Sequence, residues 1–346
     1  MSMQQDTCGV RATSTYVREA NLIDDRPILT ALASRYLQSD ADQRRYQWLY
    51  CDNPFGKARA WIACDKFDNA IGIAALFPRQ MYCQGAVVPG CVLGDFCVAP
   101  EHRTLGPALQ LQRACLQSVQ SGEFAAVYDF PSRTMLAIYK HLGIEPIEQS
   151  VRMAKVLRAD RIFRNLTVPG LSRAVMGSAN FVIGLEDRAS GSPANVEFTL
   201  QDGPCGPEYS ELAGEVGSSL GICTVRSAEY LNWRYRRHPH VAYEFMAARR
   251  GGQLLAYCVF TQSEDGATVA EFFGKPNDRV LVSLLRKLAT LSRKRGVATV
   301  SLPLLSRDPR HRLLRRVGFR AREVVPVLVI SQRRSQLLLM HGDRES

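Results

Sequence analysis

The chain has 346 residues, more than one ordinary compact domain needs and enough for two domains of about 150 residues each. Its hydrophobic share of 46% and charged share of 22% exclude a disordered, collagen-like or coiled-coil chain. The longest apolar runs, residues 71–77 and 324–330, are far shorter than the roughly 20 residues of a membrane-spanning helix, and residues 1–11 lack a secretory signal pattern. We therefore expect a soluble, cytoplasmic protein with two folded units.

The charge of the chain is unevenly distributed. Overall, 44 Lys and Arg residues outnumber 33 Asp and Glu residues, for a net charge of +11. Residues 226–346 contain 23 Lys and Arg against 10 Asp and Glu, whereas the other 225 residues carry a net charge of −2. A basic half predicts an anionic partner, which charge alone leaves open between a nucleotide, a phosphorylated glycan, a nucleic acid and a membrane surface.

The ten cysteines do not indicate a metal site or a disulfide framework. No two of them have Cys-x-x-Cys spacing, and no matching pair of histidines follows. Most lie in apolar segments, where cysteine behaves as a small hydrophobic residue. We expect reduced, buried thiols and no bound metal.

Strand-like and helix-like segments alternate along the first half, which predicts an α/β unit. Its expected strands are residues 15–19, 58–64, 70–77, 93–98, 125–130 and 150–157. Its expected helices are residues 27–37, 42–49, 107–120 and 132–142.

The second half repeats this order, as expected for an internal structural repeat. Its expected strands are residues 196–200, 243–248, 253–261, 268–273, 299–303 and 322–330. Its expected helices are residues 208–216, 228–235, 278–295 and 308–317. We expect a first domain over residues 1–158, a helical linker over 159–194 and a second domain over 195–346.

The most informative stretch is residues 93–116, where an apolar strand leads through a short turn of small residues into a helix. A helix N-terminus presents unpaired amides and the positive end of the helix dipole, which suits a pyrophosphate. Gly106 and Ala108 lack bulky side chains, so phosphate oxygens can approach the backbone. Pro107 fits the first helical position, because its missing N–H is not needed there.

This stretch resembles the acetyl-CoA-binding motif of the GNAT acyltransferases, Arg/Gln-x-x-Gly-x-Gly/Ala after a strand ending in Val-x-Pro. The chain has Val98-Ala99-Pro100 followed by Arg103-Thr104-Leu105-Gly106-Pro107-Ala108. Downstream, SRTMLAIYKHLGI (residues 132–144) is similar to the closing helix of that family, with Ser132 in place of the usual Asn and Tyr139 at the family's tyrosine. The resemblance covers residues 16–157.

The resemblance implies which residues form the donor site. The implied cofactor-binding residues are Val98, Arg103, Thr104, Leu105, Gly106, Ala108 and Ser132. Tyr139 would donate a proton to the departing thiolate, or would simply be a core tyrosine. Asp95 and Asp129 lie in apolar strands, where an unpaired carboxylate is costly to bury, so each is a candidate base or acceptor-binding group. Pairing with a nearby arginine is the structural alternative for both.

A wider resemblance covers nearly the whole chain. RRYQWLYCDNPFG (residues 44–56) and EYLNWRYRRHP (residues 229–239) are similar to tandem GNAT proteins associated with bacterial polysaccharide biosynthesis. This implies two GNAT-like domains, each with a mixed, mostly antiparallel sheet flanked by helices. The second resembles the family at HRLLRRVGF (residues 311–319), but its turn at residues 274–278 lacks the Gly-x-Gly/Ala pair. We expect that half to bind no coenzyme A and to shape the acceptor cleft.

Within that half, Trp233, Arg234 and Arg237 lie where aromatic and cationic residues alternate. They are candidates to stack on and clamp an anionic acceptor, although a helix with its tryptophan in the core has the same pattern.

We therefore expect an N-acyltransferase that uses acetyl-CoA or another acyl-CoA. Its acceptor would be an amino sugar, a sugar nucleotide or a polysaccharide precursor, and we expect neither a nucleic acid partner nor a transmembrane segment. Peripheral contact with a membrane remains open. Two alternatives remain: a Fem-type aminoacyltransferase that uses aminoacyl-tRNA, and a non-catalytic GNAT-like ligand-binding protein.

Overall fold

The structure is a computed structural model. It describes residues 15–120, 122–158, 193–219, 221–263, 266–331, 337–340 and 343–344. The expected linker, residues 159–194, lies outside these ranges except for residues 193 and 194.

Fourteen strands of the described residues form one hydrogen-bonded sheet. In spatial order they are β1 (Tyr16–Glu19), β2 (Arg59–Cys64), β3 (Ala70–Cys83), β4 (Ala86–Val98), β5 (Ala126–Asp129), β13 (Arg320–Ser331), β6 (Glu148–Val156), β12 (Thr299–Leu305), β11 (Ala267–Gly274), β10 (Gln253–Gln262), β9 (Glu244–Arg250) and β7 (Glu197–Gln201). Off this path, β8 (Ile222–Thr224) pairs with β3 and with β14 (Leu337–Leu338). Only β4–β5, β11–β12 and β8–β14 are parallel, so the expected mixed, mostly antiparallel α/β fold is confirmed.

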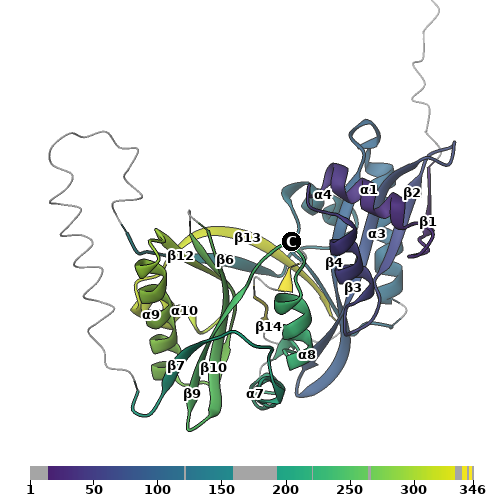
Figure 1. The fold of residues 1–346 in the computed structure, drawn as a ribbon. Helices are drawn as coiled ribbons and strands as arrows, with labels where there is room; N and C mark the ends of the chain where they lie inside the picture. Colours follow the sequence, from purple (N-terminus) through teal and green to yellow (C-terminus); the bar gives the residue numbers. More distant parts are fainter. Residues whose placement is uncertain are drawn as a thin grey trace, which may run out of the picture.

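The two halves of the chain share strands at the centre of the sheet (Figure 1). Strand β13, from the second half, lies between β5 and β6 of the first half. Strand β6 in turn lies between β13 and β12, paired along its length with residues 299–305. A boundary at residue 158 therefore separates stretches of sequence, but the sheet continues across it.

Helices cover both faces of the strands in the first half. Along β3, Ile73 and Phe77 lie in the hydrophobic cluster that includes α1 (Arg26–Tyr36), whereas Ala74 and Leu76 lie in the cluster that includes α3 (Leu105–Gln120). Because successive residues of a strand point to opposite faces, a strand buried on both sides is continuously apolar. Helix α4 (Arg133–His141) joins the α3 cluster through its buried Ile138 and Tyr139.

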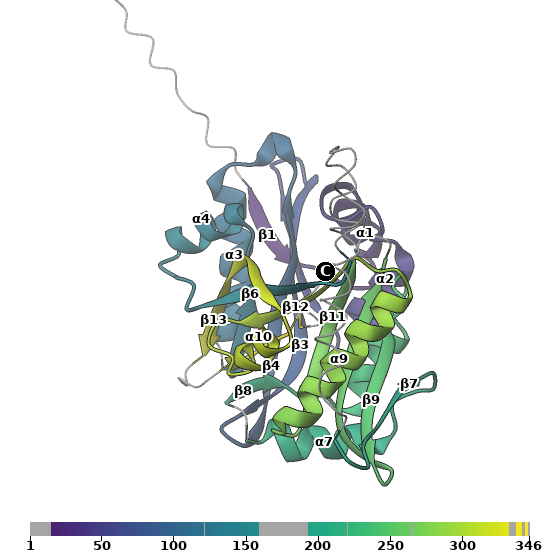
Figure 2. The same cartoon turned by 90° about the vertical axis from the view of Figure 1, so that its left-hand side faces the viewer.

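The second half has the same layers. Helix α9 (Asp278–Lys294) buries Val280, Leu284 and Leu288 against one face of the sheet, together with α10 (His311–Arg316). Helix α7 (Pro207–Gly217) packs in the central cluster, which also includes residues of the first half. Seen from the side, α9 crosses one face of β9–β11 while α7 lies at the lower edge (Figure 2).

Two short helical segments meet in that central cluster. Helix α2 (Gln43–Tyr46) continues as the π-helical turn η1 (Gln47–Cys51), and α8 (Ala228–Leu231) continues as η3 (Asn232–Arg236). The sequence predicts both stretches as single helices, without the change to π-helical turns. Trp48 of η1 stacks on Trp233 of η3, with ring centroids 5.1 Å apart.

Some elements differ from the expectations. Strands β3 and β4 form a long hairpin that extends to Cys83 and back from Ala86, because polar residues and Pro78 interrupt the apolar pattern without ending the pairing. Helix α3 begins at Leu105, so Pro107 lies inside the first turn, where a missing N–H is also tolerated. The short strands β8 and β14 were not predicted.

The nine cysteines in the described residues are all free, and all but Cys51 are buried. None of the described helices is long and apolar enough to span a membrane.

Candidate functional site

Strands β4 and β5 separate part-way along their length. They pair only where Gly90–Val92 lies opposite Ala126–Tyr128. Beyond this point β4 has an irregularity opposite β3, between the pairs Ala75–Gly94 and Ile73–Cys97, and Asp95 adopts a positive φ of 43°. A bulge of this kind bends a strand and ends its pairing, which opens a gap between β4 and β5.

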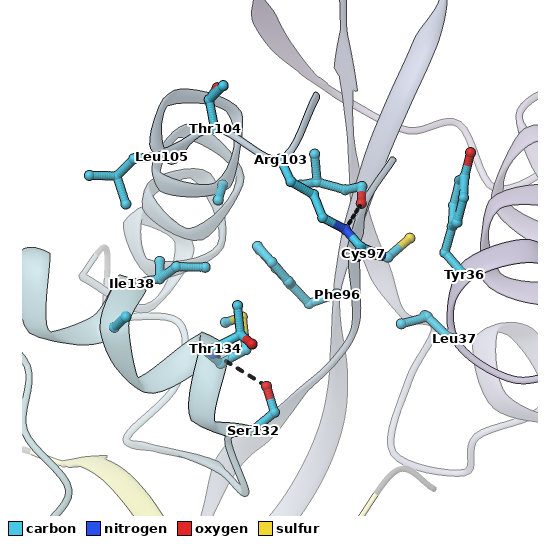
Figure 3. Close-up of a pocket in the computed structure, with 14 residues that line it drawn as sticks. Tyr36, Leu37, Phe96, Cys97, Arg103, Thr104, Leu105, Ser132, Thr134 and Ile138 are labelled. Carbon is cyan, nitrogen blue, oxygen red and sulfur yellow. Dashed lines mark hydrogen bonds between the residues drawn. The ribbon is translucent and has the colours of Figure 1, made fainter. Parts of the chain in front are cut away.

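A cavity of about 400 Å³ lies at this gap (Figure 3). Its walls come from the end of α1, the end of β4, the turn into α3, and α4. Of the predicted cofactor-binding residues, the cavity is lined by Val98, Arg103, Thr104, Leu105, Ala108 and Ser132. The structure therefore brings nearly the whole predicted donor site together, with Gly106 in the same turn.

The turn into α3 presents free backbone amides. Leu105 and Gly106 lie in the first turn of α3, where no helix carbonyl is available to their amides, and within the described part of the chain neither amide donates a hydrogen bond. A Cβ atom added to Gly106 would meet nothing within 4 Å, so the turn is open. The amide of Thr104 is already used, because it donates to the carbonyl of His102 at 2.6 Å. The amides of Leu105 and Gly106, together with the helix dipole, can therefore receive an anion here.

Two side chains shape the edges of this cavity. Arg103 donates from Nε to the carbonyl of Val98 at 3.1 Å, which holds its guanidinium beside the open turn. Ser132 caps α4, where its hydroxyl accepts from the amide of Met135 at 3.3 Å. Figure 3 shows both interactions on opposite sides of Phe96.

A second cavity of about 250 Å³ adjoins the first and shares Leu37, Phe96, Ser132 and Met135 with it. Its inner wall includes Gln112, Asp129 and Tyr139. The Tyr139 hydroxyl donates to Asp129 Oδ2 at 2.6 Å and accepts from Gln112 Nε2 at 3.0 Å. Two predicted catalytic residues, Asp129 and Tyr139, therefore meet at the inner end of the groove that the two cavities form, together with Gln112, which the sequence analysis did not single out.

Burial controls the acid–base properties of this pair. It raises the pKa of Asp129 from its ordinary value of 3.8 to about 6, even though the hydrogen bond from Tyr139 lowers it. Burial, followed by the charge of Asp129, also raises the pKa of Tyr139 well above 10. Asp129 can therefore exchange a proton near neutral pH, while Tyr139 keeps its proton.

Asp95, the third predicted catalytic residue, is engaged elsewhere. It is buried and forms a two-pronged ion pair with Arg45, with both nitrogen–oxygen distances at 2.8 Å. Its Oδ2 also accepts from the Tyr50 hydroxyl at 2.9 Å. Asp95 lines neither of the two cavities. This geometry matches the structural alternative of an arginine-paired carboxylate at the strand bulge.

The three predicted acceptor-binding residues differ in their exposure to solvent. Trp233 and Arg234 are at most 3% exposed in the core between the two halves, where the Arg234 guanidinium lies 5.2 Å from the centroid of the Trp48 ring. Arg237, directly after η3, is exposed. Only Arg237 of the three is placed to touch a ligand from solvent.

The second half contains a cavity in the position that corresponds to the donor groove. It has about 380 Å³ and lies between the ends of α7 and β11 and the starts of α9 and α10. Its helix start is different: the Asn277 side chain accepts from the amide of Val280 at 3.3 Å, and Asp278 contributes a carboxylate to the first turn. A carboxylate in the first turn weakens the attraction of this helix start for an anion, although Arg310 and Arg312 line the same cavity. That this half binds no coenzyme A stays a prediction.

No three histidine, cysteine, aspartate or glutamate side chains are grouped as metal ligands in the described part of the chain.

Comparisons with known proteins agree with this geometry. Residues 17–147 match the model of a family described as the acetyltransferase (GNAT) domain. No curated protein matches the chain.

Among solved structures, a GCN5-related N-acetyltransferase from Anabaena variabilis is 14% identical, with a TM-score of 0.67 over 91% of this chain and 72% of its own. A GCN5-related N-acetyltransferase from Kribbella flavida is 16% identical, with a TM-score of 0.63 over 92% and 71%. The N-myristoyltransferase of Saccharomyces cerevisiae, solved with bound myristoyl-CoA, is 10% identical, with a TM-score of 0.58 over 93% and 80%. The chain therefore has a GNAT-type fold, and its first half carries the sequence pattern of the GNAT domain.

Proposed function

We propose that the chain is an acyl-CoA-dependent N-acyltransferase, with acetyl-CoA as its donor and two tandem GNAT-like halves. The observation that carries the proposal is the open turn into α3, where the amides of Leu105 and Gly106 lie at one end of two adjoining cavities that reach Asp129 and Tyr139 at the other end. A pyrophosphate fits the turn, and an extended thiol arm fits the gap between β4 and β5. The N-myristoyltransferase neighbour, whose structure contains myristoyl-CoA, supports a donor of this class.

The residues at the inner end of the groove supply the proton chemistry of acyl transfer. Direct attack of an amine on the thioester forms a C–N bond and breaks the C–S bond. Asp129, with a pKa of about 6, accepts the proton that the nitrogen loses. Tyr139 provides the proton for the departing sulfur. The backbone of β4 beyond Val92, which has no strand partner on the β5 side, faces the reacting carbonyl.

The acceptor is proposed to be an amino sugar, a sugar nucleotide or a polysaccharide precursor. Two observations support an anionic acceptor: the net charge of +13 over residues 226–346 and the exposed guanidinium of Arg237. The sugar part of the proposal rests on the resemblance of residues 44–56 and 229–239 to tandem proteins of polysaccharide biosynthesis.

Thermal unfolding with and without coenzyme A tests the donor site. Coenzyme A is expected to raise the melting temperature of the wild-type chain by several degrees and that of Gly106→Glu not at all, because a glutamate there occupies the turn and repels the pyrophosphate. Gly203→Glu is the matched control, because Gly203 is also open and lies in the other half of the chain. Equal shifts in all three proteins, or none in the wild type, would reject the donor assignment. If coenzyme A did not change the melting temperature and RNA co-purified with the chain in a salt-dependent manner, the aminoacyl-tRNA alternative would be favoured.

A further inference from the structure

Gln112 is a third member of the hydrogen-bonded chain that joins Tyr139 and Asp129. It lies on α3 in a row of buried apolar residues and is only 2% exposed. Its amide nitrogen donates to the Tyr139 oxygen at 3.0 Å, and the Tyr139 hydroxyl donates to Asp129 at 2.6 Å. A buried amide is expected to be hydrogen-bonded, and here its partner is the tyrosine of the site.

These two hydrogen bonds fix where the proton of Tyr139 points. A phenol oxygen can donate one hydrogen bond and accept two. Gln112 occupies one acceptor position of Tyr139, since an amide nitrogen can only donate. When Asp129 is ionised, it can only accept, so the single proton of Tyr139 is committed to Asp129. Once Asp129 is protonated, it can donate to the second acceptor position of Tyr139, and the phenol proton becomes free to turn toward the cavity.

We propose that protonation of Asp129 switches the direction of the Tyr139 O–H bond, and that Gln112 is the positioning residue of this switch. The inference rests on the proposed function for its chemical use. The amine loses a proton to the Asp129 carboxylate as the C–N bond forms. Asp129 then donates that proton to the Tyr139 oxygen while Tyr139 donates its own proton to the leaving sulfur. Asp129 ends ionised, Tyr139 ends neutral, and the products are an amide and a thiol.

Besides burial and the hydrogen bond from Tyr139, a backbone hydrogen bond at Phe130 acts on Asp129 and lowers its pKa. The groups that face it from α3 and α4 are Cys115, Gln112 and Tyr139, and burial raises the pKa of the Cys115 thiol. On the β3 and β4 side, the cavity wall consists of the uncharged residues Ala74, Ala75, Leu93, Gly94 and Phe96. One cation lies beyond the end of β5, where the Arg344 guanidinium is 4.6 Å from the centroid of the Phe130 ring.

The test measures the two groups directly and needs no acceptor. The full chain is labelled with ¹³C at the aspartate carboxyl and tyrosine Cζ carbons, and the signals are assigned with Asp129→Asn and Tyr139→Phe. In the wild type, the Asp129 carboxyl signal should titrate with a midpoint near pH 6, and the Tyr139 Cζ signal should change with the same midpoint. Gln112→Met keeps the side-chain length but removes the donor, so the Asp129 midpoint should move upward because Tyr139 becomes a weaker donor.

Gln110→Met is the matched control on the same helix, because Gln110 bonds to Thr15 and not to this pair. It should leave both midpoints unchanged. A Tyr139 signal that does not follow Asp129, or a Gln112→Met midpoint equal to that of the wild type, would overturn the switch. Thermal unfolding of the same samples with coenzyme A separates the two proposals. If coenzyme A does not raise the melting temperature but the Asp129 and Tyr139 signals share one midpoint, the donor assignment is rejected and the switch is supported. If coenzyme A raises the melting temperature but the two midpoints differ, the switch alone is rejected.

Discussion

Trp48 and Trp233 hold each other through two reciprocal hydrogen bonds. The indole N–H of each donates to the backbone carbonyl of the other, and both distances are 2.8 Å. The rings are stacked at an interplanar angle of 22°, although 185 residues separate the two tryptophans in the sequence. Each occupies the same place in its π-helical turn, in Gln-Trp-Leu-Tyr and in Asn-Trp-Arg-Tyr. The pair therefore joins equivalent points of the two halves across a common core.

Replacing either tryptophan by alanine is expected to lower the free energy of unfolding by about 3–5 kcal/mol, as for other large buried aromatic residues. Because the two rings stack on each other, either single substitution removes the same ring contact, so the losses from Trp48→Ala and Trp233→Ala should not add, and the double variant should recover about 1–3 kcal/mol of their sum. Denaturant titration of the four proteins measures this coupling. Trp61→Ala, at the remaining tryptophan, is the control and should be additive with Trp233→Ala. Additive losses for Trp48 and Trp233 would contradict a shared interaction.

The ion pair between Asp95 and Arg45 leads to a second prediction. Asp95→Leu leaves a buried guanidinium without its carboxylate and should cost about 3–5 kcal/mol of stability. The double variant Arg45→Met with Asp95→Leu should be more stable than Asp95→Leu alone, because it removes the uncompensated charge. Urea unfolding measures both. The double variant should also keep its coenzyme A shift, since Asp95 lines neither cavity of the groove. If Asp95→Leu and the double variant were equally stable, the loss of stability in Asp95→Leu would not come from the unpaired charge of Arg45.

The donor groove could be anticipated from the sequence because its parts are local. The turn at residues 103–108 and the helix that carries Tyr139 each come from one short stretch of sequence. Small residues in such a turn indicate that a ligand can approach the backbone closely. Residue spacing within one helix is similarly informative. Gln112 could have been noticed for this reason: a glutamine in an otherwise apolar helix face needs a buried partner.

Long-range partners could not be predicted in the same way. The exchange of β6 and β13 depends on pairing between strands that lie more than 150 residues apart, and neither strand differs in pattern from an ordinary one. The role of Asp95 depends on Arg45, which lies 50 residues earlier. Trp233 illustrates the same difficulty: its aromatic and basic neighbours suit both a ligand clamp and a core helix, and the structure places it in the core.

His238 makes the stability of the chain sensitive to acid. Burial, followed by the charge of Arg234, lowers the pKa of His238 from 6.5 to about 3. Its Nδ1 accepts hydrogen bonds from the amides of His240 and Val241, which requires the unprotonated nitrogen. Below pH 6.5 the unfolded chain therefore binds a proton that the folded chain does not, so stability falls as the pH drops from 6.5 toward 3.

His238→Asn should remove this part of the acid sensitivity, since asparagine can accept the same hydrogen bonds without titrating. The wild type is expected to lose about 1–3 kcal/mol more than His238→Asn between pH 7 and pH 4, because solvent screens part of the charge on the half-buried ring; chemical unfolding at each pH measures this difference. His141→Asn, at an exposed histidine, is the control and should follow the wild type. Parallel stability curves for the wild type and His238→Asn would contradict the burial of a neutral imidazole.

Asp129 has the opposite dependence on pH, and a comparison with Asp308 separates a carboxyl group that costs stability when it is ionised from one that adds stability. The pKa of Asp129 is raised in the folded chain, so the folded chain binds the proton more tightly and loses stability as the pH rises from about 4 through 6. Asp308 is buried too, but it pairs with Arg310 at about 2.5 Å, and that pairing outweighs burial and lowers the pKa below 3.8. Asp308 therefore adds stability at neutral pH that is lost in acid.

The two asparagine variants should consequently change stability in opposite directions. Asp129→Asn should be more stable than the wild type above pH 6, by about 1–3 kcal/mol, and the advantage should vanish near pH 4. Asp308→Asn should be less stable at pH 7, with the deficit shrinking as the pH falls. Both follow from unfolding curves at pH 7.5 and pH 4.5. If Asp129→Asn were less stable than the wild type at pH 7.5, the Asp129 carboxylate would stabilise the fold as Asp308 does. The stability cost expected of a buried, ionised carboxyl group would then be absent from the site.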